Sequence, residues 1–155
     1  MKTCKLLREQ VAAATGSKKA ELVLKNAQIV NVFTQSVETG DIAIEGGYIV
    51  GIGNYEGITE KDLGGAYVCP GFLDGHIHIE SSMTSPGEFE RAVVPHGTTA
   101  VITDPHEIAN VAGTAGIRFM MQSAQKLDLD VYFMLPSCVP ATDLDESGAE
   151  LLARD

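Results

Sequence analysis

From residue 70 onward, short apolar runs alternate with amphipathic segments, and this alternation constrains the fold more than any other feature of the sequence. Strand-like runs begin near residues 72, 98 and 130, and a helix-like segment separates each from the next. Antiparallel strands can be joined by a tight turn, whereas parallel strands need a crossover connection of a dozen or more residues, usually a helix. The spacing therefore predicts βαβ units and a parallel sheet.

The three predicted strands differ in how clearly the sequence marks them. Residues 72–79 and 98–103 are rich in apolar and β-branched side chains. Residues 131–135 form a continuous apolar run, which is typical of a parallel strand buried on both faces. We expect all three to belong to one sheet.

Helical signals follow each of these strands. Residues 85–88 form a capping-box pattern with proline at the first helical position. An apolar repeat of helical spacing predicts a second helix within residues 107–126. A second capping box at residues 147–150 predicts a third helix that opens at Leu151.

The N-terminal part of the chain has a different pattern. Residues 3–15 predict a short helix, and residues 21–53 alternate apolar and polar side chains as antiparallel strands do. Gly46-Gly47 lies between two such runs, where a two-residue hairpin turn requires positive φ angles. The expected organisation is an N-terminal helical arm (residues 1–20), a small antiparallel β-subdomain (residues 21–68) and a barrel-type part (residues 69–155).

The length of the last part decides which α/β architecture to expect. A closed (β/α)₈ barrel needs about 250 residues, and only 86 of the 155 residues follow residue 69. The chain stops about one turn into its last predicted helix, and a helix of one turn cannot hold itself together. The sequence therefore predicts about three βα units of an incomplete (β/α)₈ TIM-type barrel, with an unusual three-stranded open sheet as the alternative.

Composition excludes several functional classes. The net charge of −10 and the pI near 4.7 argue against nucleic-acid binding, which needs a basic face. No run approaches the roughly 18 apolar residues of a membrane span, and the N-terminus lacks the apolar core of a signal peptide. The three cysteines are widely separated without a CxxC spacing, so we expect reduced thiols and a cytoplasmic location.

The stretch PGFLDGHIHIE, residues 70–80, carries the strongest chemical signal. His76 and His78 stand two residues apart, and on a strand this spacing projects both imidazoles from one face. Asp74 and Glu80 share that parity, and four ionisable groups on one face of a core strand are costly without a metal or mutual pairing. The pattern indicates a divalent metal site, with two surface histidines on an edge strand as the alternative.

Polar residues also follow the other two predicted strands. In a parallel α/β barrel, functional sites gather at the carboxyl ends of the strands. The candidates at these ends are Asp104, His106, Glu107, Ser137 and Cys138. The alternatives are a helix cap for Asp104, a helix-dipole contact for Glu107 and a small buried hydrophobe for Cys138. His96 precedes its strand, on the opposite rim, and is interpreted as structural.

Longer motifs then resemble a known family. The stretch from residue 70 to 80 resembles the start of the amidohydrolase superfamily of metal-dependent hydrolases. The motifs Glu80-Ser81-Ser82, DPHEIAN at residues 104–110 and PSCVP at residues 136–140 narrow the resemblance to the adenine deaminase family. It covers roughly residues 20–155, and it implies a (β/α)₈ barrel with a flanking β-subdomain and a centre of one or two metal ions.

The resemblance also implies a reaction and a set of roles. The reaction would convert adenine and water to hypoxanthine and ammonia through metal-activated hydroxide, in purine salvage. The expected metal is Mn²⁺, with Fe²⁺ or Zn²⁺ as alternatives. The implied site consists of metal ligands His76 and His78, catalytic residues His106 and Glu107, and substrate-binding residues Glu80, Ser82 and Ser137.

Two other hypotheses stay open at this stage. The chain could belong to another amidohydrolase, such as a dihydroorotase-like cyclic amide hydrolase, or it could be a non-catalytic truncated product. We expect an N-terminal portion that is inactive alone, because the remaining metal ligands are missing. For the full-length protein we expect adenine as a small-molecule substrate, no nucleic-acid or membrane partner, and a homo-oligomer.

Overall fold

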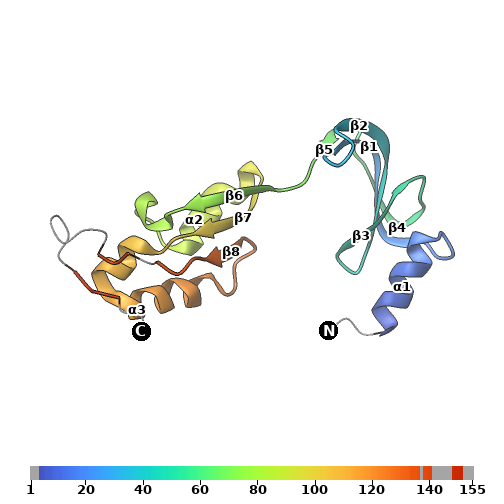
Figure 1. Cartoon of the computed structure of the whole chain (residues 1–155). Coiled ribbons are helices and arrows are strands. Elements are labelled where there is room, and N and C mark those ends of the chain that lie inside the picture. Colours follow the sequence, from blue (N-terminus) through green and yellow to red (C-terminus); the bar gives the residue numbers. More distant parts are fainter. Residues whose placement is uncertain (1–3, 137, 141–147, 152–155) are drawn as a thin grey trace. The chain divides into compact units, whose positions relative to one another are not determined.

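The computed structural model describes residues 4–136, 138–140 and 148–151 (Figure 1). The chain divides into two compact units, Met1–Pro70 and Gly71–Asp155. Each unit has hydrophobic clusters of its own and therefore its own core.

The first unit is a helix followed by a five-stranded sheet. In chain order its elements are α1 (Cys4–Ala14), β1 (Ala20–Asn31), β2 (Ser36–Glu45), β3 (Tyr48–Gly53), β4 (Gly57–Asp62) and β5 (Tyr67–Val68). The predicted N-terminal helix is confirmed. The predicted hairpin turn is also confirmed, because Gly46 and Gly47 join β2 to β3 with φ angles of +57° and +76°.

The sheet of this unit is mixed, which corrects the expected antiparallel β-subdomain. Strand β1 pairs antiparallel with β2 but parallel with β4 and β5. Buried backbone groups need hydrogen-bond partners, and β4 and β5 supply them along the second edge of β1. The sequence gives little sign of β4, because only Gly57 of its six residues is buried and no apolar alternation marks it.

A bulge in β1 is held by a carboxylate from β2. Asn26 has a φ of +57°, and the pairing register with β2 shifts there. Asp41, only 7% exposed, accepts hydrogen bonds from Lys25 Nζ, the Asn26 N–H and the Tyr55 N–H. Burial alone would raise the pKa of Asp41, but the hydrogen bonds from Lys25 and the backbone outweigh burial, and the pKa lies below its ordinary value.

Glu45 is a second buried acidic residue of the sheet, and its backbone carbonyl links the sheet to α1. Glu45, 6% exposed, accepts a hydrogen bond of 2.8 Å from Lys18 Nζ and one of 3.0 Å from the Glu21 N–H. Its backbone carbonyl accepts a bond of 3.3 Å from the Gln10 side chain on α1. The bond from Lys18 holds the pKa of Glu45 below its ordinary value, although desolvation opposes it.

The second unit confirms the predicted order of strands and helices as far as the third strand. In chain order its elements are β6 (Phe72–Ile77), η1 (Ile79–Ser82), α2 (Pro86–Val93), η2 (Val94–His96), β7 (Thr98–Thr103), α3 (His106–Ala124) and β8 (Asp130–Phe133), where η marks a 3₁₀-helix. Strand β7 lies between β6 and β8 and is parallel to both (Figure 1). The carboxyl ends of the three strands therefore meet at one edge of the sheet.

Helices α2 and α3 pack on the sheet around one hydrophobic cluster. The buried members of the cluster are Ile79, Phe89, Val101, Met120 and Leu129. β6 ends at Ile77, and after His78 the fully buried Ile79 begins η1. Glu80 therefore lies on a 3₁₀-helix, and the expectation that it shares a strand face with His76 and His78 is wrong.

The helices differ from their predicted form in two details. Ser85 is the N-cap of α2, but its side chain makes no capping hydrogen bond. Gly113, with φ 58° and ψ −145°, interrupts α3 with a kink that the apolar repeat did not predict. The third predicted helix falls mostly outside the described residues. None of the described helices is both long and apolar enough to cross a membrane.

Candidate metal site

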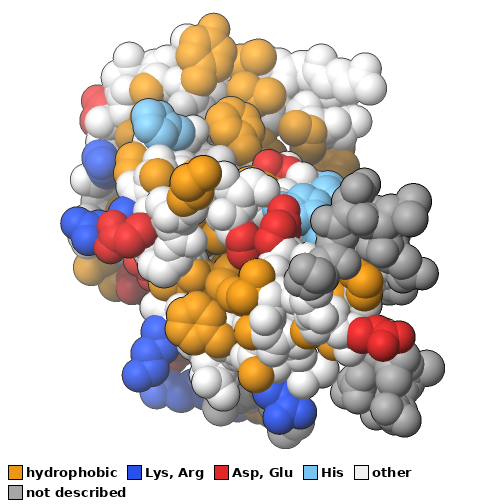
Figure 2. Space-filling view, turned by 90° about the vertical axis from the view of Figure 1, so that its left-hand side faces the viewer, with side chains coloured by type: hydrophobic (Ala, Val, Ile, Leu, Met, Phe, Trp, Pro, Cys, Tyr) orange, Lys and Arg blue, Asp and Glu red, His pale blue; other side chains and the backbone are white. Residues whose placement is uncertain are grey.

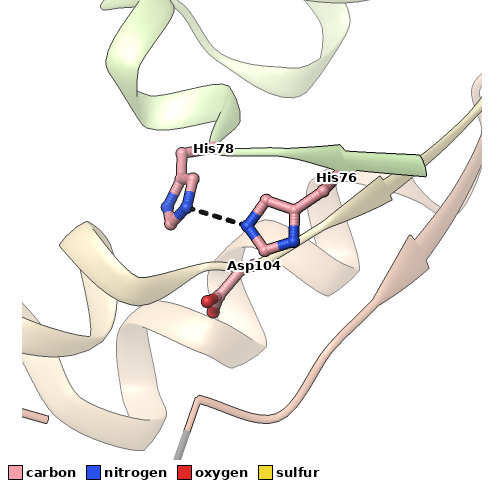
Figure 3. A group of neighbouring side chains, drawn as sticks. All are labelled: His76, His78 and Asp104. Carbon is pink, nitrogen blue, oxygen red and sulfur yellow. Dashed lines mark hydrogen bonds between the residues drawn. The ribbon is translucent and has the colours of Figure 1, made fainter. Parts of the chain in front are cut away.

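Three side chains converge where β6 and β7 end. His76 lies on β6, His78 is the N-cap of η1, and Asp104 follows β7. One ligand atom of each lies within 4.8 Å of the others, and Figure 3 shows the Asp104 carboxylate beside the two rings. The Nε2 atoms of the two histidines are 3.3 Å apart.

The parallel pairing of β6 and β7 brings these residues together. Ile77 is opposite Thr103 in the register, so the residues that follow both strands emerge at the same edge. The Asp104 N–H donates to the Ile77 carbonyl at 2.9 Å, which holds the start of the loop beside β6. The HxH spacing and the strand-end position were both visible in the sequence.

The ring of His78 is oriented by a carboxylate from another element. Its Nδ1 lies 2.9 Å from Oε2 of Glu107, in the first turn of α3, and Ser81 Oγ donates to Oε1 of the same carboxylate at 3.0 Å. Partial burial would raise the pKa of Glu107, but hydrogen bonds from His78, its own backbone and Ser81 outweigh burial, and the pKa lies below its ordinary value. An ionised carboxylate only accepts hydrogen bonds, so Nδ1 of His78 donates.

This arrangement fits a divalent cation. Two nitrogens bound at about 2.0–2.1 Å with tetrahedral angles lie about 3.3–3.4 Å apart, and the two Nε2 atoms are 3.3 Å apart. Asp104 Oδ1 is buried and accepts no hydrogen bond from the described residues. Burial of a polar atom without a partner costs free energy, and a bound cation would compensate for that cost. Imidazole and carboxylate donors suit Zn²⁺, Fe²⁺ and Mn²⁺.

Two further predicted residues lie on η1 and α3, the elements that follow His78 and Asp104 in the chain. His106 begins α3, and the centroid of its ring is 6.5 Å from that of His78. Glu80 accepts the Ile108 N–H at 3.3 Å through Oε1, while its Oε2 is buried without a hydrogen-bond partner among the described residues. His106 therefore borders the candidate metal site, and Glu80 is hydrogen-bonded to the first turn of α3.

The remaining predicted residues are not brought to the cluster by any recorded contact. The Ser82 hydroxyl donates to the Ile79 carbonyl at 2.6 Å and pairs with the Thr84 hydroxyl at 2.8 Å, both local bonds. Ser137 lies outside the described residues. Cys138 carries a free, exposed thiol rather than a buried one.

The sequence did not assign a role to two residues of the site. Asp104 was visible as a strand-end carboxylate, but the neighbouring Pro105 and helix suggested a cap as an alternative; the observed N-cap of α3 is Pro105, without a side-chain capping bond. Ser81 reaches Glu107 only because η1 turns it toward α3, and no local pattern signals that contact.

The site lies at the surface of the second unit. His76 is exposed, and the side chain of His78 is 31% exposed. In Figure 2, histidine and acidic side chains lie close together at the surface, and large apolar side chains are exposed around them. Solvent and small molecules can therefore reach the cluster.

These features define an α/β protein with a histidine and carboxylate cluster at the ends of parallel strands. The sequence profile of the amidohydrolase family matches residues 67–155, and the chain belongs to this family. The curated relatives carry a more specific name than the family does. The chain is 58% identical over 151 residues to adenine deaminase 2 of Carboxydothermus hydrogenoformans, an alignment that covers 97% of this chain and 26% of that protein.

Two other curated relatives are also named adenine deaminase, and the chain aligns with a similar share of their length. The chain is 57% identical to the adenine deaminase of Bacillus pumilus over 97% of its length, and 58% identical to that of Geobacillus kaustophilus over 96%. Each alignment covers 26% of the relative. The chain thus spans about a quarter of the length of these curated relatives.

A solved structure shows a similar fold. N-acyl-D-glutamate deacylase from Bordetella bronchiseptica, complexed with zinc and a phosphonate inhibitor, superposes with a TM-score of 0.60 at 18% identity. The match covers 79% of this chain and 30% of that one. It confirms the α/β class of the fold.

Proposed function

We propose that this chain is part of an adenine deaminase, which hydrolyses adenine to hypoxanthine and ammonia. The observation that carries the proposal is the convergence of His76, His78 and Asp104 in a chain that is 58% identical to a protein named adenine deaminase. Hydrolytic deamination needs an activated water, which a bound divalent metal can supply. This cluster offers ligand atoms for such a metal.

The three strands of the second unit are proposed to be the first strands of a (β/α)₈ barrel. Strand alternation puts Leu73 and Tyr132 on the face opposite Val101 and Val131, which pack against the helices, and these two side chains are 58% and 57% exposed. Strands β6 and β8 each have one unpaired edge among the described residues. Unpaired edges and exposed apolar faces favour further strands as neighbours.

His76, His78 and Asp104 are the proposed metal ligands in this chain. Mn²⁺ is our first choice of metal, with Fe²⁺ or Zn²⁺ as alternatives. When bound, a divalent metal lowers the pKa of water and so supplies a nucleophile at neutral pH. The protein's task here is to hold the rings and the carboxylate in place, which the strand register and the Asp104 to Ile77 hydrogen bond support.

The other residues are proposed to handle the substrate and its protons. His106 is a candidate for proton transfer, because its ring lies next to that of His78. Glu80 is proposed to accept a hydrogen bond from the substrate, since its buried Oε2 has no partner in the described part of the chain. The catalytic role of Glu107 and the substrate contacts of Ser82 and Ser137 stay predictions.

An ammonia-release assay tests this proposal directly. The natural-length protein that carries this chain, loaded with Mn²⁺, is expected to release ammonia from adenine. The variant His76→Ala/His78→Ala is expected to lose that activity, whereas His96→Ala, at the opposite end of β7, is expected to retain it. If the wild-type protein does not turn over adenine, the proposal is refuted.

The same assay separates the remaining alternatives. Hydrolysis of a cyclic amide such as dihydroorotate, without turnover of adenine, would assign the dihydroorotase-like activity instead. The isolated 155-residue chain is expected to be inactive, and measurable deamination by it would refute that expectation. A cytoplasmic location in purine salvage is consistent with the three free thiols, and the homo-oligomer stays a prediction.

A further inference from the structure

We propose that Ser81 and Glu107 form a hydrogen-bonded chain that fixes the ring of His78 for metal binding, so that both are positioning residues. Ser81 donates to one oxygen of the Glu107 carboxylate at 3.0 Å, and His78 Nδ1 lies 2.9 Å from the other oxygen. The inference rests on the metal site of the proposed function, and it gives Glu107 a different role from the catalytic one expected from the sequence.

The hydrogen bond at Nδ1 decides which ring nitrogen of His78 can bind a metal. The neutral imidazole carries one hydrogen, and a carboxylate acceptor at Nδ1 keeps it there. The lone pair is then on Nε2, the atom that faces His76 Nε2 at 3.3 Å. Without the carboxylate, the ring can take the other tautomer or rotate, and Nε2 is no longer held as a ligand.

Both ends of this hydrogen-bonded chain are attached to ordered parts of the unit. Ser81 lies on η1, which the fully buried Ile79 anchors in the core. Glu107 lies in the first turn of α3, where the neighbouring Ile108 N–H donates to Glu80 at 3.3 Å. The contact therefore joins two elements 26 residues apart in the chain.

Ser81 differs from the neighbouring serines in its hydrogen bond to Glu107. The next residue, Ser82, uses its hydroxyl for the Ile79 carbonyl and the Thr84 hydroxyl. Ser85 makes no capping bond with its side chain. Only Ser81 among these serines has a recorded hydrogen bond to Glu107, so Ser85 provides a matched control for loss of a hydroxyl.

The first test measures metal affinity rather than catalysis. The natural-length apoprotein is titrated with Mn²⁺ in competition with a chelator. Glu107→Ala is expected to weaken binding by about 10–100-fold, the usual effect of removing the partner of a histidine ligand. Ser81→Ala is expected to weaken it by about 2–10-fold, since one hydrogen bond to the carboxylate is lost. The controls Ser85→Ala and Glu88→Ala are expected to leave affinity unchanged.

Conservative variants distinguish positioning from a general loss of structure. Glu107→Gln keeps a carbonyl that can accept from Nδ1 and an amide that can donate to Ser81, so it is expected to restore most of the affinity. Ser81→Thr keeps the hydroxyl and is expected to do the same. Nitrogen-15 NMR of the His78 ring is expected to show hydrogen on Nδ1 in the wild-type apoprotein and a mixture of tautomers in Glu107→Ala.

The outcomes separate this inference from the proposed function. Equal Mn²⁺ affinity for wild type, Ser81→Ala and Glu107→Ala would overturn the positioning role, whatever the substrate. Loss of deamination in Glu107→Ala at saturating metal, with unchanged affinity, would also overturn it, because Glu107 would then act on the reacting atoms. A wild-type protein that binds Mn²⁺ in this pattern but does not deaminate adenine would refute only the proposed activity.

Discussion

The Nε2 atoms of His76 and His78 face each other at 3.3 Å, although one residue lies on strand β6 and the other caps a 3₁₀-helix. Two nitrogen lone pairs at this distance repel unless a hydrogen or a cation lies between them. The buried, unpartnered oxygen of Asp104 adds a negative group to the same place. The pair therefore has the character of a cation site.

Removal of either histidine is expected to weaken metal binding strongly. Loss of an outer partner costs about 10–100-fold in affinity, and loss of a direct ligand is expected to cost more than about 100-fold. His76→Ala, His78→Ala and the control His96→Ala can be compared by metal content after dialysis against a weak chelator. Retention of metal by both site variants would show that the ligands have been wrongly assigned.

Truncation of Ile79 is expected to destabilise the second unit and loosen the site with it. The side chain is fully buried, so Ile79→Ala is expected to lower the free energy of unfolding by about 2–5 kcal/mol, and Ile79→Val by about 0.5–1.5 kcal/mol. Urea denaturation followed by circular dichroism measures both. Val111→Ala, at a side chain that is 78% exposed, is the control; an equal loss there would contradict the prediction.

Asp41 is expected to be the most sensitive polar position of the first unit. Asp41→Ala leaves the N–H groups of Asn26 and Tyr55 without this acceptor, and Lys25 keeps only the Tyr55 carbonyl. Unsatisfied donors of this kind cost about 1–3 kcal/mol, which thermal denaturation can detect. Glu56→Ala removes an exposed ion pair with Lys19 and is expected to change stability by less than about 1 kcal/mol. Equal effects of the two variants would be evidence against a stabilising role of Asp41 at the β1 bulge.

Acid is expected to destabilise the first unit. The pKa values of Asp41 and Glu45 lie below their ordinary values in the folded chain. A lowered carboxyl pKa contributes stability that is complete above the unfolded value, about 4, and is lost as the pH falls through the folded value. The melting temperature should therefore fall as the pH drops below about 4, and less steeply in Asp41→Asn. A melting temperature that rises over this range would rule the mechanism out.

The strand order of the second unit was predictable because its signals are local. A run rich in apolar and β-branched residues marks β7, a continuous apolar run marks β8, and the long connection between them excludes a tight hairpin. Strands β4 and β5 were not predictable for the opposite reason. Their residues are mostly exposed, and what defines them is the free edge of β1, which lies far away in the sequence.

The residues of the candidate site also divide into those that local sequence patterns predict and those that depend on tertiary contacts. The pairing of His76 with His78 follows from their spacing of two residues in extended backbone, and the strand-end position of Asp104 follows from the βα order. The contact between His78 and Glu107 spans 29 residues and depends on how α3 begins. Ser81 depends on η1, which forms because Ile79 is drawn into the core, and that is a tertiary effect.

Gly113 divides α3 into two segments. The segment before it begins with His106 and Glu107, and the segment after it supplies Met120 to the core. Its φ of 58° with ψ of −145° is readily adopted only by glycine. Because Ile108, the neighbour of Glu107, packs on the same hydrophobic cluster as Met120, any repacking of that cluster bears directly on the position of the Glu107 carboxylate.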